Sequence, residues 1–165
     1  MRKVNQLLDS QQRSVQPIFV SSYIPRKCGI ATFTKDLTKA MNDLNPDGLA
    51  EIVAVDPGDE ELVYPVEVKG KITKFDLQSY DLAAQIINAS DAEVLCLQHE
   101  YGLYGTVDPD HYVGEYIVRM LRQVDKPIVT TLHTILEHPL PAHRAVMEEI
   151  SQLSDIMITM MPNAK

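Results

Sequence analysis

Short apolar segments alternate with longer amphipathic segments along most of this chain, and this alternation restricts its fold more than any other feature. The apolar segments are too short for typical helices and do not alternate with polar residues, as in strands buried on both faces of a sheet. In the longer segments apolar residues recur every three or four positions, as in helices that pack one side on a sheet. The expected strands are 18–22, 50–55, 93–97, 128–132 and 156–160, and the expected helices are 30–44, 76–90, 110–124 and 142–153.

Strands and helices in this order form βαβ units, so the sequence predicts an α/β fold with a mainly parallel sheet. Right-handed crossovers place helices on both faces of such a sheet. Residues 62–68 contain Pro65, which makes them an edge strand or a loop and brings the count to about six strands. The expected architecture is therefore Rossmann-like and doubly wound, formed by residues 17–165 after a polar N-terminal arm of residues 1–16.

Length and composition fit one soluble domain. Hydrophobic residues make up 45% and charged residues 23% of the 165 positions, which excludes a disordered or coiled-coil chain. Two cysteines exclude a disulfide framework, and no apolar run is long enough to span a membrane. Residues 1–16 lack the apolar core of a signal peptide, so the expected location is the cytoplasm.

The charge is distributed unevenly along the chain. Residues 1–44 hold seven basic and three acidic residues, whereas residues 45–165 hold eight and twenty. The acidic remainder argues against a nucleic-acid partner. The basic region is either a local binding site for an anion or a basic N-terminal arm.

In a doubly wound sheet, ligands bind beyond the carboxyl ends of the strands where the strand order reverses. The loop after Ser22 contains Arg26, Lys27 and Gly29 directly before a helix, whose N-terminus favours anions. Its single glycine matches neither the dinucleotide-binding nor the P-loop pattern. The alternative is a tight turn with solvated basic side chains. Cys28 is a possible nucleophile there, but no base accompanies it in sequence.

The loops after Gln98 and Leu132 carry polar residues at the same edge of the expected sheet. His99, Glu100 and Tyr101 form a set suited to a sugar-like ligand, because aromatic faces pack on sugar rings and carboxylates accept hydroxyl protons. The alternative is a capped strand end with ordinary packing. His133 begins the next loop and points into the same crevice.

All five histidines fall between residues 99 and 143, which raises the question of a metal site. The segment from His133 to His138, HTILEH, matches neither HxxEH nor HExxH. We therefore expect no bound metal, and a neutral histidine that forms a hydrogen bond with a ligand is favoured instead.

Four segments resemble, in the same order, the N-terminal domain of bacterial glycosyltransferases of family 4, which have the GT-B fold. The segments are FVSSYIPRKCGIATFTKDL, VLCLQHEYGLYG, PIVTTLHTIL and ISQLSDIMITM. The resemblance implies retaining transfer of a sugar from a nucleotide-sugar, without a further cofactor, in a cleft between two Rossmann-like domains. One departure is Thr106, which follows Gly105 where relatives often have a second glycine.

The resemblance also implies roles for single residues. Gly29, with Arg26 and Lys27, faces the donor phosphates, and His133 lies beside the transferred sugar. His99 and Glu100 belong to the loop on the acceptor side. The residues that bind the donor nucleotide belong to a C-terminal domain that this sequence does not contain.

We therefore expect the acceptor-side domain of a glycosyltransferase, inactive by itself and completed by a C-terminal domain in cis or in trans. The expected ligands are a nucleotide-sugar donor and a sugar or glycan acceptor. The alternative is a stand-alone domain that binds a sugar, a phosphate or another protein without catalysis.

Overall fold

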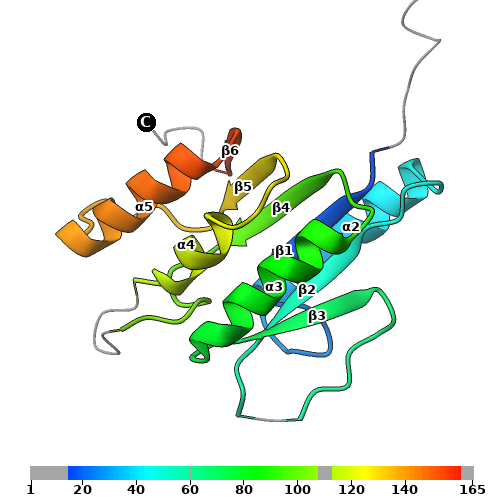
Figure 1. Ribbon diagram of the computed structural model, residues 1–165, viewed down its shortest axis with the longest axis horizontal. Helices are drawn as coiled ribbons and strands as arrows, with labels where there is room; N and C mark the ends of the chain where they lie inside the picture. The colour runs from blue at the N-terminus through cyan, green and yellow to red at the C-terminus, as the bar shows by residue number, and fades with distance from the viewer. Residues whose placement is uncertain (1–14, 60, 108–112, 161–165) are drawn as a thin grey trace, which may run out of the picture.

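A computed structural model describes residues 15–59, 61–107 and 113–160. Its centre is a six-stranded sheet with the order β3-β2-β1-β4-β5-β6, in which every neighbouring pair is parallel (Figure 1). The strands are β1 (Pro17–Ser21), β2 (Glu51–Asp56), β3 (Val68–Thr73), β4 (Val94–His99), β5 (Ile128–Leu132) and β6 (Ile156–Thr159). The order reverses between β1 and β4, so the fold is Rossmann-like as the sequence predicts.

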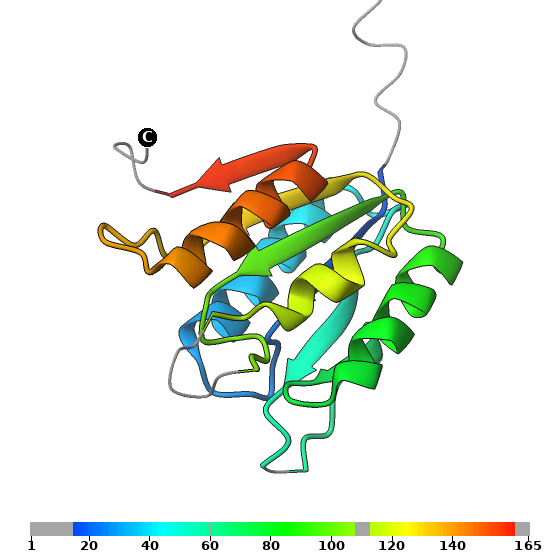
Figure 2. The ribbon, with the colours of Figure 1, turned by 60° about the vertical axis from the view of Figure 1, so that its left-hand side comes forward.

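Helices cover both faces of the sheet. The helices are α2 (Gly29–Leu44), α3 (Leu77–Ala89), α4 (Tyr116–Leu121) and α5 (Pro141–Leu153). Figures 1 and 2 show α3, α4 and α5 on one face and α2 on the other. Right-handed crossovers produce this arrangement, because the chain moves one way along the sheet from β1 to β3 and the opposite way from β4 to β6.

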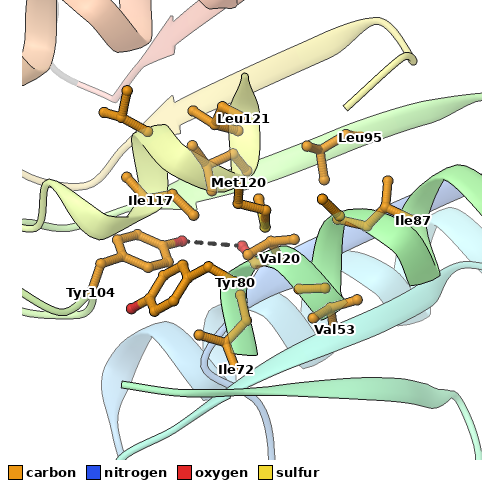
Figure 3. Packing of buried hydrophobic residues seen from close by; sticks show 14 of the residues in the cluster. Val20, Val53, Ile72, Tyr80, Ile87, Leu95, Tyr104, Ile117, Met120 and Leu121 are labelled. Atoms are coloured by element: carbon orange, nitrogen blue, oxygen red, sulfur yellow. Dashed lines mark hydrogen bonds between the residues drawn. The ribbon is translucent and has the colours of Figure 1, made fainter. Parts of the chain in front are cut away.

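Two apolar cores hold the helices on the sheet. The larger core lies under α3, α4 and α5 and is shown in Figure 3; it includes Val20, Val53, Leu95, Tyr80, Ile87, Ile117 and Met120. The smaller core lies under α2 and joins Phe19, Ile52 and Ala54 to Leu37 and Met41. Because neighbouring residues of a strand point to opposite faces, each central strand contributes to both cores.

Of the two alternatives for residues 62–68, an edge strand or a loop, the structure has the loop for all but the last residue. Residues 62–67 form no strand, and β3 begins at Val68, whose amide donates to Pro65 O at 3.0 Å. β3 lies at the edge of the sheet, where exposed lysines discourage pairing with another chain. Lys69 and Lys71 are exposed and only Ile72 is buried, so an apolar run does not mark this strand.

The expected helix 110–124 is too long. Residues 108–112 lie outside the described part of the chain, and α4 covers only Tyr116–Leu121. Gly114 has a positive φ of 75°, which ends any helix extending from that side. In the described part of the chain, no helix has the length and apolar character needed to cross a membrane.

Candidate functional site

The three loops singled out in the sequence meet at the carboxyl edge of the sheet. β4 lies between β1 and β5, with Val20 beside Leu97 and His99 beside Leu132. The amide of His133 donates to His99 O at 3.0 Å, which holds the loop after β5 against the end of β4. The strand register therefore brings the candidate residues of these loops to the point where the strand order reverses.

His133 is held by the side chain of Gln98. Its Nε2 lies 2.8 Å from Gln98 Oε1, and Gln98 is buried, with its own carbonyl accepting from Tyr104 OH at 2.7 Å. Because an amide oxygen can only accept, Nε2 carries the proton and Nδ1 keeps its lone pair. The edge of Phe33 lies against the ring, with 5.0 Å between centroids. Burial lowers the pKa of His133, and the charge of Glu100 offsets only part of this effect. The lowered pKa favours a neutral ring.

Glu100 and Thr134 connect the two loops on the outer side of this histidine. The Thr134 hydroxyl donates to the Glu100 carboxylate, and both residues are half-buried. Glu100 is therefore held in place while the residue remains partly exposed. A carboxylate in this position can accept a hydrogen bond from a ligand hydroxyl.

His99 lies in the interior of the protein rather than at its surface. The residue is fully buried, with Tyr101 edge-on at 5.0 Å and Tyr104 stacked at 6.2 Å between ring centroids. Neither ring nitrogen has a hydrogen-bond partner within the described residues. Burial, with a smaller contribution from His133, lowers the pKa of His99 to about 4. His99 and Tyr101, also buried, therefore belong to the packed interior behind the site.

The loop after Ser22 leads directly into the N-terminus of α2. Cys28 caps the helix, with its Sγ accepting from the Ala31 amide at 3.3 Å and lying 3.0 Å from Ser22 Oγ. Gly29 is exposed, and a Cβ added there would meet no atom within 4 Å apart from its chain neighbours and the backbone of its own helix. The exposed N-terminus of a helix suits the approach of an anion.

The basic residues of this loop do not gather around Gly29. Arg26 Nη1 donates to Val55 O at 3.3 Å, so its guanidinium is anchored at the end of β2, and Lys27 is exposed. Lys74, which sequence reasoning missed, lies near Arg26 and donates from Nζ to Gly102 O at 2.8 Å. Burial and the charge of Arg26 lower the pKa of Lys74. Lys74 directly follows β3, so the correct position of that strand is the signal that points to it.

The histidines do not form a metal centre in the part of the chain that the structure describes. There, no group of three or more His, Cys, Asp or Glu side chains is arranged to hold a metal ion. His143 contacts Tyr101 through its ring, and His138 is exposed. His111 lies outside the described residues.

Comparisons with known proteins show similarity to solved structures only. No family model matches the chain, and no curated protein matches it. Homoserine dehydrogenase of S. aureus, solved at pH 6.5, is 12% identical over 88% of this chain, with a TM-score of 0.40. The same enzyme at pH 7.0 is 12% identical over 87% of the chain, with a TM-score of 0.39. This chain spans only 32% of the length of that enzyme, and similarity at this level carries no information about activity.

Proposed function

We propose that this chain is the acceptor-side domain of a retaining glycosyltransferase that uses a nucleotide-sugar donor. The observation that carries the proposal is the position of His133, oriented by Gln98 at the point where the strand order reverses. The Glu100 carboxylate, held by Thr134, lies beside it. These residues belong to the segments that resemble family 4 of the glycosyltransferases.

The residues of this site would position the substrates. The Nδ1 lone pair of His133 can accept a hydrogen bond from a hydroxyl of the transferred sugar, and Glu100 can accept one from the acceptor. The N-terminus of α2 at the exposed Gly29 suits the donor phosphates. The proposed enzyme holds its donor nucleotide with a second domain, supplied in cis or in trans.

Sugar binding by the chain itself tests this proposal. We would titrate the chain with glycosides of glucose, galactose and mannose and follow binding by NMR. We expect saturable binding of at least one sugar, weakened about tenfold or more by His133→Ala and by Glu100→Gln, because each removes a charged or directional hydrogen-bond partner. His138→Ala, at an exposed position outside the crevice, is the matched control.

Two outcomes would contradict the proposal. One is the absence of saturable sugar binding, and the other is binding that neither crevice variant weakens. The isolated chain should also fail to turn over nucleotide-sugars. Sugar binding without transfer, even after fusion to the donor domain of a family 4 enzyme, would support the stand-alone binding domain instead.

A further inference from the structure

A cavity lies next to the candidate site, between the loop after β5 and helix α5. Its volume is about 270 Å³. Most of its wall is apolar and comes from Leu132, Ile135, Leu136, Pro139 and Met147. A cavity of about 150 Å³ lined by apolar side chains is large enough to bind benzene. This cavity therefore has room for a phenyl ring or a short branched alkyl group.

The cavity adjoins the candidate sugar site through Thr134. Thr134 and Tyr101 line it, and the Thr134 hydroxyl donates to the Glu100 carboxylate. A sugar hydroxyl bound at Glu100 would therefore lie near Thr134, which belongs to the cavity wall. A substituent on that sugar can then enter the cavity while the sugar hydroxyl stays bound to the Glu100 carboxylate.

The wall of the cavity suits an apolar substituent better than a second sugar. His143, whose ring lies edge-on to Tyr101 at 4.9 Å, has a buried Nδ1 without a hydrogen-bond partner in the described structure. Thr134 already donates to Glu100, and Arg144, Glu148 and Ser151 are exposed. A sugar ring in the cavity would place hydroxyls against the apolar side chains, where they would lack hydrogen-bond partners, whereas an aryl or alkyl group meets these side chains without that cost.

From this geometry we infer that the acceptor is amphiphilic, a sugar or polyol that carries an aryl or short alkyl group bound between the β5 loop and α5. The inference rests on the proposed function, because Glu100 fixes the polar part of the acceptor. Burial of the apolar group removes it from water and supplies the additional affinity.

Paired glycosides test the inference directly. Methyl and phenyl glycosides of the same sugar differ only in the group that would enter the cavity. We expect the phenyl glycoside to bind the full chain about tenfold more tightly than the methyl glycoside. Met147→Lys and Ile135→Gln should remove this preference and leave methyl glycoside binding unchanged, because both place a polar group in the apolar wall.

Met160→Lys provides the matched control, since Met160 is 49% exposed at the end of β6 and does not line the cavity. Circular dichroism and thermal unfolding would verify that each variant folds. Ile135 is 38% exposed, so its replacement keeps the test available if Met147→Lys unfolds the chain.

The outcomes separate the inference from the proposed function. Equal binding of methyl and phenyl glycosides would overturn the inference and leave the proposed function intact. A phenyl preference that persists in both cavity variants would also overturn it, because the phenyl group would then bind elsewhere. If neither glycoside binds, the proposed function itself is contradicted.

Discussion

At the scale of single residues, the two nitrogens of the His133 ring have different chemistry, and the Gln98 amide determines which nitrogen carries the proton. Replacement by Gln98→Leu removes the acceptor for Nε2–H, so we expect the ring to populate both neutral tautomers. The lost hydrogen bond should also lower stability by about 1 kcal/mol. Nitrogen-15 NMR of the histidine ring measures the tautomers, with Gln85→Leu, at an exposed position of α3, as the control. An unchanged ring spectrum in Gln98→Leu would contradict the assigned hydrogen bond.

The residues of this site differ in how far the sequence predicts them. His133 follows an apolar strand, so its place at the carboxyl edge of the sheet can be predicted. Its contact with Gln98 cannot, because that contact depends on the register that pairs Gln98 with Thr131. The burial of His99 beneath two tyrosine rings is likewise a result of packing.

His99 should make stability depend on pH. Its pKa is lowered from about 6.5 in the unfolded chain to about 4 in the fold, so in this window the unfolded state binds more protons. The contribution of His99 to the free energy of unfolding is therefore complete above pH 6.5. It is lost as the pH falls towards 4, by up to about 1.4 kcal/mol per pH unit. Urea unfolding between pH 4.5 and 7 measures this slope, and His99→Leu should reduce it. Equal slopes for the two chains would contradict the burial of a neutral His99.

At the scale of elements, Gly29 and Gly105 appear alike in the sequence but have opposite surroundings. A Cβ at Gly105 would lie 2.1 Å from Lys74 O and 2.6 Å from Tyr116 Cδ2, whereas one at Gly29 would meet no described atom within 4 Å beyond its chain neighbours and its own helix backbone. We expect Gly105→Ala to cost about 1–3 kcal/mol or more of stability through overpacking. Gly29→Ala, at the first position of α2, should leave stability unchanged or slightly higher.

The two alanine variants control for each other in urea unfolding. Equal stability would contradict the close packing of the loop after β4 against the end of β3. The sequence did not locate β3, because the pairing of β3 with β2 forms a strand whose lysines and glycine give no apolar signal. Helices α2, α3 and α5 were predicted correctly to within one residue because each has a strong apolar stripe.

At the scale of the whole molecule, the sheet face that carries α2 becomes more exposed towards β6. The register pairs Phe19 with Cys96, Cys96 with Val129, and Val129 with Ile156, so these four residues share that face. Phe19 lies under α2 and is 1% exposed, Cys96 and Val129 are half-buried, and Ile156 is 55% exposed. Ile158, 44% exposed, lies two residues further along the same edge strand.

An apolar edge strand of this kind favours association between copies of the chain. We expect the average mass measured by sedimentation velocity to rise with protein concentration. The double variant Ile156→Lys, Ile158→Lys should suppress this rise, because lysine on an edge strand opposes pairing through charge and hydration. Leu44→Lys, which changes a residue 87% exposed at the end of α2, should not suppress it. A mass independent of concentration in the unmodified chain would show that the exposed isoleucines of β6 do not support self-association.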